Sequence, residues 1–130
     1  MRTILIIDDS KFLCAVLRDT LEKTGYRATT VNSIIEAAKY LKGETPDLIL
    51  LDINLPGGVQ GNDACRMLKG SPSCKNVPIV LMSSATAEEM AAKQQQSGAD
   101  GYLVKPFTPP QILAWLTANE ALLSRRQNAL

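Results

Sequence analysis

Five short apolar runs alternate with segments of helical periodicity along this chain. The runs are rich in β-branched residues and span 3–7, 27–31, 47–51, 77–82 and 101–104. Strands that alternate with helices form parallel sheets, because each helix returns the chain to the edge where the next strand begins. The third run, Leu48-Ile-Leu-Leu51, is apolar without alternation, which is typical of a strand covered on both faces. The pattern predicts an α/β domain with this run near the centre of a parallel sheet.

Sequence signals mark the ends of the intervening helices. Three segments match a capping box, with Ser or Thr at the helix start and Glu or Gln three residues later: Ser33 to Glu36, Thr86 to Glu89 and Thr108 to Gln111. Four glycines follow helical stretches, where a left-handed residue is expected to end the helix: Gly25, Gly43, Gly70 and Gly98. The stretch 111–130 is predicted to be one helix that runs into a polar end.

Composition limits the classes of function. The 130 residues predict one domain, and 14 basic against 13 acidic residues leave no global field for nucleic acid or an anionic membrane. Three cysteines without a C-x-x-C spacing argue against a disulfide framework and against a zinc site. No histidine is present, and no long apolar stretch opens the chain. We therefore expect a cytoplasmic protein with no nucleic-acid and no membrane partner.

Reactive side chains stand where the predicted strands end. Asp8 and Asp9 follow the first run, Asp52 the third, Ser83 the fourth and Lys105 the fifth. Because ligands in open α/β sheets bind beyond the carboxyl ends of the strands, these side chains are expected at one edge. Crowded carboxylates repel one another by several kcal/mol, which a divalent cation would relieve. Acidic residues are also favoured at helix N-termini, so the first pair has a second interpretation as a helix cap.

Four motifs in this register carry a resemblance to a known family. They are Asp8-Asp9-Ser10, Leu51-Asp52-Ile-Asn-Leu-Pro56, Pro78-Ile-Val-Leu-Met-Ser83-Ser84 and Gly101-Tyr102-Leu-Val-Lys105-Pro106-Phe107. In this order they resemble the receiver domain of two-component response regulators, of the single-domain type similar to CheY. The resemblance implies a flavodoxin-like, doubly wound, five-stranded parallel sheet of order 2-1-3-4-5 with five helices. It covers residues 1–125 as the receiver domain and leaves 126–130 as a C-terminal tail.

The resemblance implies a phosphoryl acceptor and a magnesium site. Asp52 is implied to accept the phosphoryl group, and Mg²⁺ to be held by Asp8, Asp9, Asp52 and the backbone carbonyl of Asn54. The residue types suit this chemistry, because a carboxylate attacks a phosphoanion poorly until a metal screens their charges. Mg²⁺ also prefers few carboxylates together with waters and phosphate oxygens, which matches this sparse set.

The remaining motif residues are implied to form a switch. Ser83 and Lys105 are implied to contact the phosphoryl oxygens, and Tyr102 to turn inward when the loop at Ser83 moves. In a strand, Tyr102 has packing as its default role. Trp115 is expected to be partly core, although some of its patch has a second interpretation as a partner surface. The family also implies a cis peptide bond before Pro106.

The implied function is a signalling switch without metabolic turnover. The chain would catalyse only its own phosphorylation and dephosphorylation, with a sensor histidine kinase or phosphotransfer protein as donor. An unknown output protein would bind the face of the fourth helix, fifth strand and fifth helix, and the chain would be a monomer or a phosphorylation-dependent dimer.

Three alternatives remain open at this point. An aspartyl-nucleophile phosphatase usually has a second Asp two residues after the first, where this chain has Asn54. A flavin or nucleotide binder would place a phosphate-binding loop after the first strand, where Asp8 and Asp9 repel anions. A receiver-like interaction scaffold would never be phosphorylated. The loop 55–61 is one residue longer than the common receiver version and carries Gln60 where Asp is frequent.

Overall fold

One parallel sheet organises the chain. The computed structural model describes residues 2–55 and 61–124. Its strands are β1 (Thr3–Ile7), β2 (Arg27–Val31), β3 (Leu48–Asp52), β4 (Ile79–Ser83) and β5 (Gly101–Val104). Every neighbouring pair is parallel, and the spatial order is β2-β1-β3-β4-β5. This order confirms the predicted flavodoxin-like topology.

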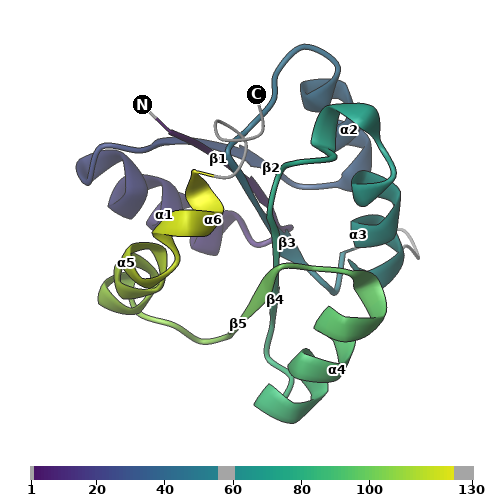
Figure 1. The fold of residues 1–130 in the computed structure, drawn as a ribbon. Helices are drawn as coiled ribbons and strands as arrows, with labels where there is room; N and C mark the ends of the chain where they lie inside the picture. Colours follow the sequence, from purple (N-terminus) through teal and green to yellow (C-terminus); the bar gives the residue numbers. More distant parts are fainter. Residues whose placement is uncertain (1, 56–60, 125–130) are drawn as a thin grey trace.

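Helices cover both faces of the sheet, as Figure 1 shows. The described residues form α1 (Lys11–Lys23), α2 (Ile34–Leu41), α3 (Gly61–Lys69), the 3-10 turn η1 (Pro72–Cys74), α4 (Ala87–Ser97), α5 (Pro109–Ala118) and α6 (Glu120–Leu123). In Figure 1, α1, α5 and α6 lie on one side of the sheet, and α2, α3 and α4 lie on the other. The predicted five helices become six because the last one is divided in two.

The sheet divides the core into two clusters. Along β3, Ile49 and Leu51 belong to the cluster beneath α2, α3 and α4, while Leu48 and Leu50 belong to the cluster beneath α1 and α5. All four side chains are fully buried, which confirms the central position predicted for this strand. Burying a side chain of this size stabilises the fold by about 1.5–3 kcal/mol. The strands are therefore rigid supports for the residues at their ends.

Two strands end one residue later than predicted. The strand predicted at 47–51 is β3 at Leu48–Asp52, because Asp52 still pairs with Met82 of β4. The strand predicted at 77–82 is β4 at Ile79–Ser83, because Ser83 still pairs with Val104 of β5, while the Val77 N–H closes the turn at η1 by donating to the Cys74 carbonyl (3.1 Å). Both corrections make a predicted site residue the last residue of its strand.

The helices begin at the predicted cap residues, but the full capping box is formed at one of the three. Ser33, Thr86 and Thr108 each accept a hydrogen bond from the backbone N–H three residues ahead. Only Thr108 completes the reciprocal capping box, in which the side chain of Gln111 accepts from the Thr108 N–H (2.7 Å). At α2 the corresponding glutamate accepts a hydrogen bond from the N–H of Asn32 instead.

The predicted glycine stops divide into two groups. Gly25 and Gly98 have positive φ angles of 95° and 79°, as expected of a residue that ends a helix in the left-handed conformation. Gly43 and Gly70 do not have positive φ, so the prediction is wrong at these two positions. After α2 the backbone continues in turn geometry, with the Gly43 N–H donating to the Tyr40 carbonyl (3.2 Å).

The C-terminal helix breaks at Asn119. Its side-chain amide donates to the Trp115 carbonyl (2.8 Å), and the two helices α5 and α6 meet at this residue. A short polar side chain that bonds the nearby backbone competes with helix continuation. The predicted single helix over 111–130 is therefore wrong within the described residues, and 125–130 lie outside them. The guanidinium of Arg2 holds α6 through Ser124 Oγ (2.7 Å) and an ion pair with Glu120.

Candidate functional site

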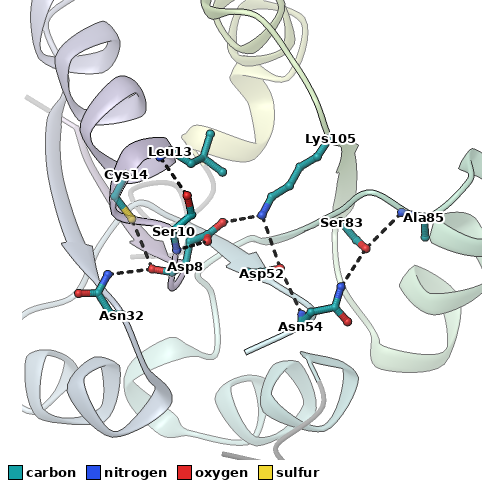
Figure 2. Close-up of polar contacts among 10 residues, drawn as sticks. All are labelled: Asp8, Ser10, Leu13, Cys14, Asn32, Asp52, Asn54, Ser83, Ala85 and Lys105. Carbon is teal, nitrogen blue, oxygen red and sulfur yellow. Dashed lines mark hydrogen bonds and ion pairs between the residues drawn. The ribbon is translucent and has the colours of Figure 1, made fainter. Parts of the chain in front are cut away.

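The carboxyl ends of four strands bring the predicted site residues together. Asp8 directly follows β1, Asp52 ends β3, Ser83 ends β4 and Lys105 directly follows β5. Figure 2 shows their side chains converging at one edge of the sheet. The backbone supports this arrangement, since the Lys105 N–H donates to the Ser83 carbonyl (2.7 Å). The Lys105–Pro106 peptide is cis, as the resemblance implies.

Lys105 bridges two buried carboxylates. Its Nζ lies 2.7 Å from Asp8 Oδ2 and 3.6 Å from Asp52 Oδ1. The Asp8 side chain is fully buried and the Asp52 side chain is 6% exposed, whereas the Lys105 side chain is 22% exposed. A buried carboxylate without a partner is costly, so the lysine compensates charge that the fold has removed from water. It lies nearer to Asp8 than to the predicted acceptor.

Three carboxylates form a cluster that suits a divalent cation. Asp8, Asp9 and Asp52 each offer one oxygen, and these oxygens all lie within 4.8 Å of one another. Asp9 is exposed, so the cluster opens to solvent on its side. With Lys105 the formal charge of the group is minus two, and hard oxygen donors are the ligands that Mg²⁺ prefers. The donor set therefore fits Mg²⁺.

Asp52 is held through one of its oxygens. Its Oδ1 accepts a hydrogen bond from the Asn54 N–H (3.1 Å), which fixes the carboxylate at the end of β3. Burial raises the pKa of Asp52 above its ordinary value, and the neighbouring Asp8 and Asp9 act in the same direction. The Asn54 N–H and Lys105 oppose this rise in pKa. The ionised carboxylate is therefore an unfavourable charge that a cation at the site would stabilise.

Ser83 lies beside the acceptor with its hydroxyl only weakly engaged. Its Oγ accepts from the Ala85 N–H at 3.3 Å and lies 3.5 Å from Asn54 Nδ2. Such long contacts are weak, so a stronger acceptor placed at this edge can recruit the hydroxyl as a donor. The residue itself is buried, with 4% of its surface exposed.

Tyr102 and Trp115 both pack against the core. Tyr102 lies in β5 opposite Leu81 and contacts the cluster beneath α2, α3 and α4. Trp115 contacts the cluster on the other face of the sheet. Both side chains are partly buried, which agrees with the packing interpretation of each in this state.

Ser10, rather than the acidic pair, caps α1. The Ser10 hydroxyl accepts a hydrogen bond from the Leu13 N–H (3.2 Å), and the first turn of α1 contains no acidic residue. Asp8 instead uses its Oδ1 to accept from the Ser10 N–H (2.9 Å). The interpretation of Asp8 and Asp9 as the helix cap is therefore wrong, and their carboxylates remain at the sheet edge.

Two contacts at Asp8 were missed by sequence reasoning. Its backbone carbonyl accepts hydrogen bonds from Asn32 Nδ2 (2.9 Å) and from the thiol of Cys14 (3.4 Å). Asn32 follows β2 directly, so the rule that gathers strand ends at one edge applies to it as well. Cys14 is buried, and so are Cys65 and Cys74. The predictions about the loop 55–61, including Gln60, concern residues 56–60, which lie outside the described residues.

Comparison with known proteins identifies the class of this fold and site. The model of the response regulator receiver domain matches residues 4–117. The phosphate regulon transcriptional regulatory protein PhoB of Rhizobium meliloti is 35% identical over 115 residues, which are 88% of this chain and 50% of PhoB. The chain thus spans about half the length of this curated relative. The predicted absence of a nucleic-acid partner stays a prediction, because that relative is named a transcriptional regulator.

Solved structures agree with this class. Chemotaxis response regulator CheY4 of Vibrio cholerae is 29% identical with a TM-score of 0.84, and the match covers 91% of this chain and 98% of that one. The receiver domain of the sensor histidine kinase PA1611 from Pseudomonas aeruginosa is 27% identical with a TM-score of 0.78, over 90% and 95% of the two chains. That structure holds a magnesium ion in its active-site cleft.

The parallel sheet of order 2-1-3-4-5, the acidic cluster at its carboxyl edge and the family match together define a protein of the two-component signalling class. This chain belongs to the response regulator receiver domain family. Within the described residues, no helix is long and apolar enough to cross a bilayer.

Proposed function

We propose that Asp52 accepts a phosphoryl group and that residues 1–125 act as one receiver domain. The observation that carries the proposal is the cluster of Asp8, Asp9 and Asp52 oxygens within 4.8 Å, bridged by Lys105. In the transfer, an Asp52 oxygen forms a bond to phosphorus while the phosphorus–nitrogen bond of a phosphohistidine breaks. The released imidazole takes its proton from solvent, and Asp52 becomes an acyl phosphate.

Asp8, Asp9, Asp52 and the backbone carbonyl of Asn54 would hold Mg²⁺. The ion supplies screening of the charges on the nucleophile and on the phosphoryl oxygens. Asp8 is already fixed by the Ser10 N–H and by Lys105, so little of its conformational entropy remains to be lost on binding. Asp9 is exposed and provides the side from which an ion enters.

Ser83 and Lys105 would bind the new phosphoryl oxygens. Phosphorylation adds a dianionic group with three strong acceptors, which favours a closer approach of the Ser83 hydroxyl and the Lys105 ammonium. Ser83 is weakly bonded at present, so its movement breaks only long contacts. We propose that this shift makes room for Tyr102 to turn inward and alters the face formed by α4, β5 and α5. The phosphoryl group biases the two states only through its differential contacts.

The donor would be a sensor histidine kinase or a phosphotransfer protein, and an output protein would bind the altered face. The chain would turn over no metabolite, because its chemistry is limited to its own acyl phosphate. We also propose a cytoplasmic location, a monomer or phosphorylation-dependent dimer, and no direct contact of these residues with nucleic acid.

The test is labelling with a small phosphodonor. Incubation with acetyl phosphate and Mg²⁺ is expected to add one phosphoryl group, measured as an intact-mass increase that alkali removes. Asp52→Asn should abolish the increase, and Asp19→Asn, on the exposed surface of α1, should keep it. Chelation of the metal should suppress labelling of the unsubstituted protein.

Three outcomes would contradict the proposal. The first is full labelling of Asp52→Asn, which would place the acceptor elsewhere. The second is sustained hydrolysis of a phosphoester over many turnovers, which would support the phosphatase alternative. The third is absence of any label with Mg²⁺ and donor, which would favour the unphosphorylated scaffold.

A further inference from the structure

The carbonyl of the peptide that joins Asp8 to Asp9 is held from two sides, and the preceding peptide is held by β2. The Asp8 N–H, which belongs to that preceding peptide, donates to the carbonyl of Val31, the last residue of β2 (3.1 Å). The Asp8 carbonyl accepts from the side-chain amide of Asn32 (2.9 Å) and from the thiol of Cys14 in α1 (3.4 Å), as Figure 2 shows. The carbonyl is an acceptor only, so the Asn32 group that faces it must be the NH₂ donor.

We call the contacts of Asn32 and Cys14 with the Asp8 carbonyl the clamp. The clamp determines where the carboxylate of Asp9 points. The peptide bond is planar, so fixing the Asp8 carbonyl oxygen also fixes the nitrogen of Asp9 and the direction in which the Asp9 Cα leaves. Asp9 is exposed, whereas Asp8 is fully buried. Its position relative to Asp52 therefore depends on the orientation of this peptide.

The clamp is built separately from the carboxylate contacts. The Asp8 carboxylate is engaged by the Ser10 N–H and by Lys105, whereas the described hydrogen bonds to the carbonyl come from Asn32, next to β2, and from Cys14 in α1. Asn32 is itself anchored, because its backbone N–H donates to Glu36 Oε2 (2.6 Å) at the start of α2. Any substitution at Asn32 other than proline keeps this backbone donor and changes only the side-chain contact.

We infer that Asn32, assisted by Cys14, is a positioning residue that orients the Asp8–Asp9 peptide for Mg²⁺ binding. The inference rests on the proposed function, since it assumes that the acidic cluster binds this ion. Partners that orient metal ligands from outside the coordination shell commonly change metal affinity by about 10- to 100-fold when removed. Asn32 provides the shorter of the two contacts, and an amide is a stronger donor than a thiol, so the loss of Asn32 should have the larger effect.

The surroundings of Asn32 allow its side chain to be truncated without opening a void in the core. Asn32 and Cys14 line a cavity of about 430 Å³ between α1 and β2, together with Lys11, Arg18 and Thr30. Asn32 is partly exposed there, so truncation leaves no sealed void in the core. Once the amide is removed, the Cys14 thiol is the described side-chain donor that remains on the Asp8 carbonyl.

The experiment measures Mg²⁺ affinity of the unphosphorylated chain by titration, followed through backbone amide NMR shifts. Asn32→Ala is expected to weaken Mg²⁺ binding about 10-fold. Asn32→Leu keeps the branch at Cγ without a donor and should show the same loss, which serves if the alanine variant fails to fold. Cys14→Ser retains a donor and should stay close to the unsubstituted affinity.

Ser33→Ala is the matched control for a structural effect. It removes the cap of α2 one residue away, because the Ser33 hydroxyl accepts from the Glu36 N–H (3.2 Å), but it has no contact with Asp8 among those described. It should lower stability in urea while leaving Mg²⁺ affinity unchanged. Asn32 variants with unaltered Mg²⁺ affinity, or an equal loss in Ser33→Ala, would overturn the inference.

The outcomes separate this inference from the proposed function. If the unsubstituted chain binds Mg²⁺ and is phosphorylated but the Asn32 variants bind equally well, only the positioning role fails. If the unsubstituted chain binds no Mg²⁺, the proposed function and the inference fail together.

Discussion

At the scale of single residues, Asp52 sets a conflict between stability and function. Burial raises the pKa of this carboxyl, with Asp8 and Asp9 acting in the same direction. A raised folded-state pKa means that the contribution of Asp52 to stability is present below its ordinary value of 3.8 and is lost as pH rises. At neutral pH the ionised carboxylate is therefore a net cost to the folded state.

Asp52→Asn is accordingly expected to raise the free energy of unfolding at pH 7, by roughly 0.5–2 kcal/mol, when metal is chelated. The amide keeps the shape of the side chain and removes the charge. The gain should shrink as pH falls toward the ordinary pKa of the carboxyl. Urea unfolding at several pH values with a chelator checks this, and a loss of stability at pH 7 would contradict it.

The site residues differ in how far their positions follow from sequence. Asp8, Asp52 and Lys105 each stand at the end of an apolar run, so the rule of strand ends brings them together once the strand order is known. Asn32 also follows a strand, but an asparagine between a strand and a helix is ordinary turn composition. Its side chain contacts a backbone carbonyl, and every residue has such a group, so the sequence does not mark which carbonyl is the partner. The contact is therefore visible only in the three-dimensional structure.

At the scale of elements, β5 and α5 approach closely at one glycine. A Cβ placed on Gly101 would lie 3.2 Å from Trp115 Cζ2 and 3.7 Å from Val80 Cγ2. Gly101 therefore provides the space into which the indole ring packs. This role differs from that of Gly25 and Gly98, which are needed for their positive φ angles.

Gly101→Ala is expected to destabilise the fold by about 1–3 kcal/mol, because the indole ring must shift to admit the methyl group. Gly43→Ala is a suitable control, since nothing lies within 4 Å of its Cβ position and its φ is not positive. The control should be neutral or slightly stabilising. Equal urea midpoints for the two variants would show that the Trp115 ring can move to admit the methyl group without loss of stability.

The positions of strands and helices were predictable from the sequence, whereas the residues at which they end were less predictable. Apolar runs and caps are local patterns, and Ser33, Thr86 and Thr108 begin helices where they indicate. The break at Asn119 depends on a side-chain contact with the Trp115 carbonyl, which competes with a helical pattern that otherwise continues. Periodicity averages over several residues and is insensitive to such a single contact.

At the scale of the whole molecule, the two core clusters enclose all three thiols. Cys14, Cys65 and Cys74 are 5%, 0% and 0% exposed. Burial raises the pKa of all three, that of Cys14 to about 11 with the carboxylate of Asp8 contributing. Because the folded values exceed the ordinary 9.0, their contribution to stability is complete below pH 9 and is lost as pH rises further.

The thiols are therefore expected to react with a disulfide reagent at pH 8 only when the fold opens. Reaction in buffer should be slower than that of free cysteine by orders of magnitude, and it should accelerate across the urea transition. The release of thiolate chromophore from the reagent measures the rate. Fast reaction of one thiol in the folded protein would reveal local opening that bypasses global unfolding.

The link between Arg2 and α6 has a consequence for engineering this domain. Arg2 precedes β1, so its contacts with Ser124 and Glu120 lie at the edge of the sheet opposite the acidic cluster. A fluorescent reporter or second module fused after residue 124 would emerge beside residue 2 and leave the cluster unobstructed. The same proximity suits residues 2–124 to circular permutation, with a short linker joining residue 124 to residue 2.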